Sequence, residues 1–210
     1  MNNYIYRRMP EGVYAGGSFA VVGCGGVGTW VAAMLAMSGA KELELYDSDT
    51  LSVDNLSRLP YPEAAIGEPK ARLLRDWLHA LRPECDIRVF PHWQPFMGAP
   101  QASVVLSCVD SYKIRRALCI TCRVEHLSYI DVGADGFDAN VDSQPAEFDI
   151  SQGNDYQRGI YAPTAMLAAS MACHVALTCR RAKYARIGFV PNEERFYLQE
   201  GDNVQKPKEG

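Results

Sequence analysis

Short apolar runs and segments of helical periodicity alternate along most of the chain. The apolar and alternating runs predict strands over 18–22, 42–46, 85–90, 103–109 and 127–132. Segments of helical spacing predict helices over 26–37, 69–81, 111–125 and 163–181. The run at 103–109 is almost entirely apolar, as is usual for a strand buried on both faces of a parallel sheet. Strands and helices that alternate in this order indicate an α/β fold.

The remaining segments predict a loop and a small β extension. Residues 137–160 are polar and irregular, and we expect them to form a mobile loop over the functional site. Residues 186–199 alternate weakly, which predicts a terminal hairpin or edge strands, and the tail over 201–210 is expected to be disordered. The predicted fold is therefore Rossmann-like: a mostly parallel sheet with helices on both faces, a long C-terminal helix and a small β extension. We expect a single domain over residues 1–200.

Composition and charge narrow the class of protein. The 210 residues are 48% hydrophobic and 22% charged, as is usual for a globular protein, and the formal net charge of −4 argues against a general nucleic-acid surface. No apolar run is long enough to span a bilayer, and residues 1–12 lack a signal-peptide core. The seven cysteines are expected to be reduced and mostly buried. We therefore expect a cytoplasmic protein with no nucleic-acid partner and no membrane partner.

A glycine-rich turn joins the first predicted strand to the first predicted helix. Its glycines are Gly23, Gly25, Gly26 and Gly28. Backbone N–H groups and the dipole at a helix start favour an anion, and glycine allows phosphates to approach closely. Asp47 ends the second predicted strand, 19 residues after Gly28, which is the spacing of an acid that binds ribose hydroxyls. These residues are the first candidates for nucleotide binding.

A second group of polar residues indicates a triphosphate rather than a dinucleotide. The group supplies two cations, an amide and two carboxylates: Asp49, Asn55, Arg58, Lys70 and Asp110. Cations offset the charge of phosphates, and a carboxylate such as Asp110 can hold a metal that bridges them. Each residue alone also fits an ordinary role, because similar glycine loops bind NAD or FAD, surface cations are usually solvated, and Asp110 can cap the following helix. The ordered set favours ATP with Mg²⁺.

Taken in order, these motifs resemble the ThiF/MoeB/HesA family, the adenylating relatives of ubiquitin-activating enzymes. The resemblance covers most of residues 18–185, and it is especially close at Gly67-Glu68-Pro69-Lys70. It implies that Gly26 lies under the phosphates and that Asp47 holds the ribose. It also implies that Asn55, Arg58 and Lys70 contact the triphosphate. Asp110 would hold Mg²⁺, and Asp49 would lie near the metal or the phosphates. The catalytic residues that it implies are Arg58, Lys70 and Asp110.

The sequence also departs from the family pattern. Many members have two CxxC pairs for a structural zinc, whereas this chain has one, Cys119 to Cys122, inside a predicted helix, so zinc is not expected. No cysteine occurs over 127–172, which argues against a thioester formed by this chain at the usual place; Cys173 and Cys179 are expected to be core residues. Relatives are usually homodimers, and some lend an arginine to the neighbouring subunit. Arg7 or Arg8 can serve that role, although two solvated arginines are the simpler interpretation.

The predicted function is ATP-dependent activation of a C-terminal carboxylate as an acyl adenylate, with release of pyrophosphate. The expected partner is a small ubiquitin-like or sulfur-carrier protein, in a homodimeric enzyme. A peptide, or a carboxylate on a small molecule or nucleoside, is the alternative for the same chemistry. Two further classes stay open: a non-catalytic nucleotide-binding scaffold subunit, and an NAD-dependent oxidoreductase, for which no hydride-transfer site is visible.

Overall fold

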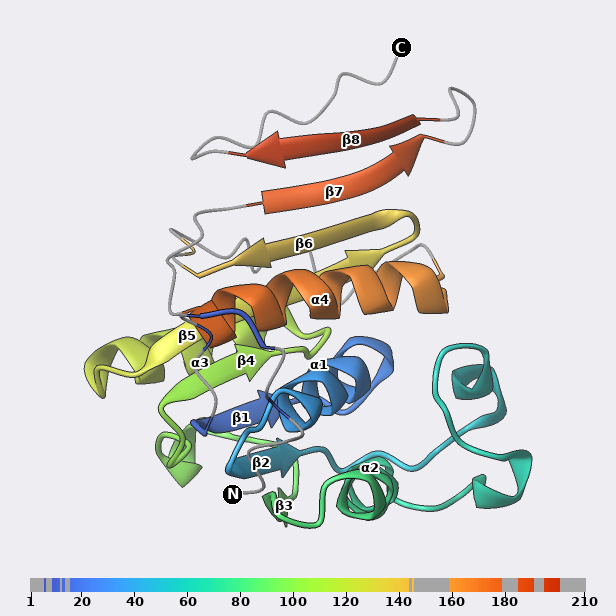
Figure 1. Cartoon of the computed structure of the whole chain (residues 1–210), viewed down its shortest axis with the longest axis vertical. Coiled ribbons are helices and arrows are strands. Elements are labelled where there is room, and N and C mark those ends of the chain that lie inside the picture. Colours follow the sequence, from blue (N-terminus) through green and yellow to red (C-terminus); the bar gives the residue numbers. More distant parts are fainter. Residues whose placement is uncertain are drawn as a thin grey trace.

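The computed structural model describes residues 6, 9–11, 13, 16–143, 145, 159–178, 185–190 and 195–200. Strands and helices alternate in the predicted order through the first two-thirds of the chain (Figure 1). The helices are α1 (Gly26–Met37), α2 (Lys70–Leu81), α3 (Tyr112–Val124) and α4 (Ala162–Thr178). The strands are β1 (Ser18–Val22), β2 (Glu42–Tyr46), β3 (Asp86–Phe90), β4 (Val104–Ser107), β5 (Ser128–Asp135), β6 (Asp138–Asp142), β7 (Ala185–Val190) and β8 (Arg195–Glu200). Short 3₁₀ helices are η1 (Val53–Ser57), η2 (Glu63–Ala65) and η3 (Pro95–Met97).

All eight described strands form one sheet in the order β3-β2-β1-β4-β5-β6-β7-β8. The first five strands of this order run parallel, and β1 pairs with both β2 and β4. The last three strands add in antiparallel fashion. The strand order reverses direction between β1 and β4, which is where open α/β sheets bind their ligands. The predicted mostly parallel, Rossmann-like sheet is confirmed.

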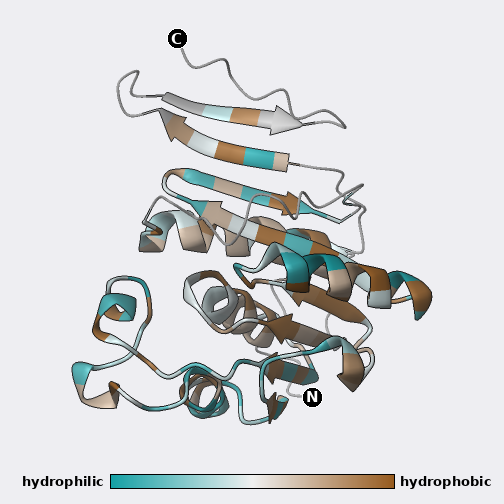
Figure 2. Cartoon of the chain, turned by 180° about the vertical axis from the view of Figure 1, so that it is seen from behind, coloured by the Kyte–Doolittle hydropathy of each residue, from teal (hydrophilic) through white to brown (hydrophobic). Residues whose placement is uncertain are grey.

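Helices cover both faces of the sheet. α1, α2 and α4 lie on one face, and their buried side chains meet the apolar strand residues Phe19, Val21, Leu43, Leu45, Leu106, Ile130 and Val132. α3 covers the other face, where its side chains pack on Ala20, Val22, Val105 and Tyr129. Alternate residues of one strand thus enter opposite cores, as the pleat of a strand requires. Figure 2 shows α3 in front of the sheet, with hydrophobic and hydrophilic residues alternating along it.

The predicted loop over 137–160 is wrong at its beginning. β5 continues to Asp135, and a two-residue turn of Gly136 and Phe137 leads directly into β6. Gly136 has a φ of 57°, a left-handed conformation that glycine adopts without strain and that hairpin turns require. Asp, Asn and Gly are poor strand formers, so the sequence around β6 hides a strand that its pairing with β5 and β7 stabilises.

Several expectations concern residues outside the described part of the chain. They are the remainder of the predicted loop at 144 and 146–158, the tail over 201–210, Arg7, Arg8 and Cys179. The antiparallel pair β7 and β8 agrees with the terminal hairpin predicted over 186–199. Within the described residues, the helices fall short of the length and apolarity that crossing a membrane requires. The single-domain boundary, the dimer and the cytoplasmic location stay predictions.

Candidate functional site

A pocket of about 500 Å³ opens at the carboxyl ends of the parallel strands. The segments that follow β1, β2, β3 and β4, together with part of β5, form its lining. Most of the predicted site residues line it: Gly23, Gly25, Gly26, Asp47, Asp49, Arg58, Lys70 and Asp110. Gly28 and Asn55 do not line it. Loops from parallel strands meet at one edge of the sheet, which is why positions 87 residues apart in the sequence, Gly23 and Asp110, share one pocket.

The glycine turn is shaped by close backbone contacts. A Cβ atom on Gly28 would lie 1.8 Å from the Gly23 carbonyl oxygen, so only glycine lets the turn pack against α1. Gly23 has a φ of 95°, and a Cβ there would lie 2.8 Å from the Cys108 carbonyl oxygen. Gly25 has open space where its Cβ would be. The first turn of α1 lacks an acidic residue and a side-chain cap, so its N–H groups are available to an anion.

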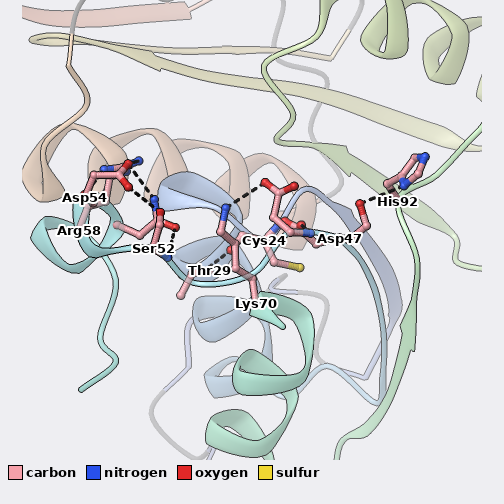
Figure 3. A network of polar contacts seen from close by, with 11 residues as sticks. Cys24, Thr29, Asp47, Ser52, Asp54, Arg58, Lys70 and His92 are labelled. Atoms are coloured by element: carbon pink, nitrogen blue, oxygen red, sulfur yellow. Dashed lines mark hydrogen bonds and ion pairs between the residues drawn. The ribbon is translucent and has the colours of Figure 1, made fainter. Parts of the chain in front are cut away.

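Asp47 is held rigidly at the end of β2. Its Oδ2 accepts a hydrogen bond from the Cys24 N–H at 2.7 Å, and its Oδ1 accepts one from the Asp49 N–H at 2.7 Å. Burial raises the pKa of Asp47, although these two hydrogen bonds oppose the shift. The carboxylate therefore links the glycine turn to the loop after β2 and fixes both walls of the pocket (Figure 3).

The two predicted phosphate-binding cations are both paired with carboxylates. Lys70 Nζ lies 3.0 Å from Asp49 Oδ2, and the Lys70 side chain is only 11% exposed. Arg58 donates from Nη1 to the Asp54 carbonyl at 2.7 Å, while its Nη2 lies 3.7 Å from Asp54 Oδ2 (Figure 3). Phosphate oxygens that entered the pocket would compete with these carboxylates for the same donors.

Arg58 also covers the glycine turn. A Cβ atom on Gly26 would lie 2.9 Å from Arg58 Cδ, so the arginine stem lies against this glycine. The indole N–H of Trp30 on α1 donates to the Arg58 carbonyl at 3.1 Å and fixes the backbone of this loop. The ring of Trp30 lies edge-on to Trp77 of α2, with centroids 6.0 Å apart. The contact between Trp30 and Trp77 therefore holds in place the indole that binds the backbone of the Arg58 loop.

Asn55 and Asp110 differ in their surroundings. Asn55 is 5% exposed and caps η1, because its Oδ1 accepts from the Ser52 N–H at 3.3 Å and its Nδ2 donates to Asp54 at 3.1 Å. A contact between Asn55 and phosphates stays a prediction. Asp110 lies exposed in the turn between β4 and α3 and lines the pocket. Its side chain makes no ion pair or hydrogen bond to any residue that the structure describes.

The carboxylate in the pocket is of a kind that fits Mg²⁺ bound together with phosphates. Among the described residues, no three His, Cys, Asp or Glu side chains gather as a protein-only metal site. Mg²⁺ is usually held by one or two carboxylates together with substrate phosphates, and Asp110 in the pocket has the chemistry to be one such carboxylate. Cys119 and Cys122 both lie buried in the α3 face that meets the sheet. Burial raises the pKa of Cys122 and of pocket-lining Cys108 to about 12, so both are protonated at neutral pH.

The structure adds pocket residues that the sequence analysis did not assign to the site. His92 follows β3, and its Nδ1 lies 3.0 Å from Ser48 Oγ at the pocket edge (Figure 3). Arg115 of α3 lines the pocket from a buried position. Its sequence signal is the spacing: Arg115, Leu118, Cys119 and Cys122 fall on the buried face of one helix. A cation on such a face requires a buried partner, but the spacing does not say which residue that partner is.

The fold and the site together define a Rossmann-like α/β protein with a pocket, lined by a glycine turn, two cations and carboxylates, at the switch point of its sheet. The chain belongs to the ThiF family, whose family model matches residues 16–180. This match includes all ten predicted site positions, from Gly23 to Asp110.

Similar sequences include two kinds of enzyme. The chain is 31% identical over 122 residues to tRNA threonylcarbamoyladenosine dehydratase of Haemophilus influenzae, covering 55% of this chain and 47% of that protein. It is 32% identical over 143 residues to ubiquitin-like modifier-activating enzyme 5 of Caenorhabditis elegans, covering 61% of this chain and 33% of that protein. The chain thus spans half or less of the length of these relatives.

Solved structures show the same fold. Escherichia coli MccB, crystallised with AMPCPP and MccA, superimposes with a TM-score of 0.74 at 19% identity, covering 88% of this chain and 63% of that chain. PaaA superimposes with a TM-score of 0.67 at 18% identity, covering 95% of this chain and 67% of that chain. At identities below 20%, these likenesses concern the fold alone.

Proposed function

We propose that this chain catalyses the ATP-dependent adenylation of a carboxylate. The observation that carries the proposal is the joint placement of the α1 N-terminus, Arg58, Lys70 and exposed Asp110 around one pocket. A dinucleotide oxidoreductase would use the glycine turn and Asp47 but would have no need for two cations and a free carboxylate beside them. Membership of the ThiF family supports the same chemistry.

In the proposed reaction a carboxylate oxygen attacks the α-phosphorus of ATP. A bond forms between this oxygen and the phosphorus, and the bond from the α-phosphorus to the bridging oxygen breaks. Pyrophosphate leaves with the electron pair, and the product is an acyl adenylate. The nucleophile is already an anion, so the reaction needs no general base, and the protein contributes positioning and electrostatic stabilisation.

The pocket residues divide these tasks. Asp47 would accept hydrogen bonds from the ribose hydroxyls, and the N–H groups at the start of α1 would hold the phosphates. Arg58 and Lys70 would offset the repulsion between the incoming carboxylate and the triphosphate, and then stabilise the charge on departing pyrophosphate. Asp110 would hold Mg²⁺ with phosphate oxygens as the other ligands, and the cation would supply charge neutralisation.

The acceptor proposed first is the C-terminal carboxylate of a small ubiquitin-like or sulfur-carrier protein. Similarity to the ubiquitin-like modifier-activating enzymes supports it. A peptide stays the alternative of the same kind. A second candidate is a carboxylate on a modified nucleoside, which the similarity to tRNA threonylcarbamoyladenosine dehydratase favours. Five of the six described cysteines are buried, and the thiol pKa of half-buried Cys108 is raised, which argues against a thioester at these six positions.

Thermal unfolding with candidate nucleotides is the first test. ATP with Mg²⁺ should stabilise the protein by about 2.7 kcal/mol at a hundredfold excess over Kd, and NAD should change the unfolding temperature little. ATP–pyrophosphate exchange should then appear with the correct carrier and vanish when the C-terminal carboxylate of the carrier is amidated. Tight NAD binding without an ATP response would refute the adenylation proposal. ATP binding without exchange, with any carrier, peptide or nucleoside carboxylate, would favour the scaffold function.

A further inference from the structure

A buried ion pair lies directly behind the pocket. Arg115 of α3 is 2% exposed, and its Nη1 lies 2.7 Å from Asp131 Oδ2 on β5. Tyr129 donates from its hydroxyl to Asp131 Oδ1 at 2.9 Å. Burying two charges costs desolvation free energy that their attraction rarely exceeds, so a buried ion pair is weak evidence for added stability. The two elements that the pair connects, α3 and β5, both contribute residues to the lining of the pocket.

The same guanidinium holds the turn that carries Asp110. Arg115 Nε donates to the carbonyl of Val109 at 2.7 Å, and Val109 immediately precedes Asp110. Two of its nitrogens thus bind two different elements: the β4–α3 turn through Val109 and the central strand β5 through Asp131. The planar arginine fork fixes the relative positions of its acceptors, which a lysine ammonium cannot do.

The turn needs such a support. β4 ends at Ser107 and α3 begins at Tyr112. Residues 108–111 connect them and belong neither to the strand nor to the helix. Cys108 donates its N–H to the Val22 carbonyl at 2.8 Å, which anchors the start of the turn to β1. Beyond this anchor, the hydrogen bond from Arg115 is what ties the Val109 carbonyl, one residue before Asp110, to the protein interior.

We propose that Arg115 is a positioning residue for the metal ligand Asp110. Its guanidinium, fixed by Asp131, holds the turn so that the Asp110 carboxylate faces the phosphates and the divalent cation bound with them. The inference rests on the proposed function, because it takes ATP with Mg²⁺ as the occupant of the pocket. The role assigned to Arg115 is an indirect one, because its Nε and Nη1 donate to Val109 and Asp131.

The test measures how much Mg²⁺ is required for ATP to raise the unfolding temperature. Arg115→Lys keeps the charge beside Asp131 but loses the fork, and it should raise the half-saturating Mg²⁺ concentration about 10- to 100-fold, as loss of a residue that orients a metal ligand does. ATP affinity in EDTA should stay unchanged. The matched control is Arg116→Met on the exposed side of α3, which should leave both values unchanged.

A second variant separates positioning from stability. R115M/Y129F/D131L replaces the polar cluster by apolar side chains and leaves no buried charge unpaired, so it should fold. It should still show the raised Mg²⁺ requirement. An unaltered requirement in either folded variant would overturn the inference, and so would an equal loss of ATP affinity with and without Mg²⁺. If wild-type protein binds ATP independently of Mg²⁺, the metal role of Asp110 fails and this inference with it. If the requirement shifts but exchange is never found, only the proposed reaction fails.

Discussion

The parallel and antiparallel regions of the sheet have different roles. The parallel strands β1 to β5 place the loops that follow them at one edge, and these loops supply the pocket. In the antiparallel extension β6 to β8, neighbouring strands run in opposite directions, so their carboxyl ends do not meet on the same side of the sheet. Its central polar group, Asp138 with Arg186 and Tyr197, joins the three strands to one another instead. The comparison teaches that polar residues gather in one pocket where neighbouring strands run parallel, because the loops that follow such strands lie at the same edge of the sheet.

The largest expected effect is that of Asp110→Ala. It removes the proposed metal ligand, so ATP–pyrophosphate exchange should fall to background. The unfolding temperature of the protein without nucleotide should not change, because Asp110 is exposed. Exchange rate and circular dichroism, measured on the same preparation, check both statements. Full exchange activity in the folded variant would show that the metal is held elsewhere.

The next effect in size concerns the two cations. Lys70→Ala and Arg58→Ala should each lower the exchange rate by roughly 10²–10³-fold, about 3–4 kcal/mol, as the loss of one preorganised charge contact does. Lys41→Ala provides a matched control, since Lys41 is an exposed lysine that does not line the pocket. Rates at saturating ATP separate the loss of catalysis from weaker binding. A rise in KM alone would mean that these cations contribute only to ground-state binding.

A carboxylate of the extension should behave in the opposite way to Asp110. Asp138→Ala removes the common acceptor of Arg186 and Tyr197, so it should lower the free energy of unfolding by about 1–3 kcal/mol. ATP affinity should stay at the wild-type value, because Asp138 does not line the pocket. Denaturant unfolding and nucleotide titration of the same variant give both values. Weakened ATP binding would show that the two regions are coupled.

The smallest effect is expected at Asp49. Its carboxylate pairs with Lys70 in the nucleotide-free pocket, and Asp49→Asn would free this cation for phosphate. ATP affinity should therefore rise about two- to fivefold, because the Asp49 carboxylate is largely exposed and its ion pair with Lys70 is partly screened by solvent. Isothermal titration at low and high salt checks the change, which should shrink as salt increases. Weaker ATP binding would instead identify Asp49 as a direct contact of the metal or phosphates.

Local patterns account for what the sequence predicts well. The strands and helices from β1 to α3 lie within one residue of the predicted bounds, except β4, which ends two residues earlier than predicted. Each of them depends on apolar spacing within a few residues. The glycine turn and Asp47 belong to one such local unit. Strand β6 is not predicted because its Asp and Asn residues are poor strand formers. Its extended conformation depends on pairing with β5 and β7, which its own sequence does not encode.

Contacts between distant segments set the limit of prediction at the site. Arg115 pairs with Asp131, which lies 16 residues away on another element, and His92 meets Ser48 across 44 residues. Sequence spacing carries no information about such pairs, since the packing of α3 and the loop after β3 onto the sheet brings them together. Of the neighbouring arginines of α3, Arg116 is exposed, whereas Arg115 is buried.

The hydrogen bond from the Trp30 indole to the Arg58 carbonyl gives the pocket an optical signal of its own. Indole emission depends on the polarity and hydrogen bonding around the ring, and Trp30 is bound to the backbone of the residue expected to meet the phosphates. A shift of Arg58 from Asp54 toward a nucleotide would change this environment. Stopped-flow fluorescence of the unlabelled protein can then follow nucleotide entry in real time, with a Trp30→Phe variant to identify the source of the emission.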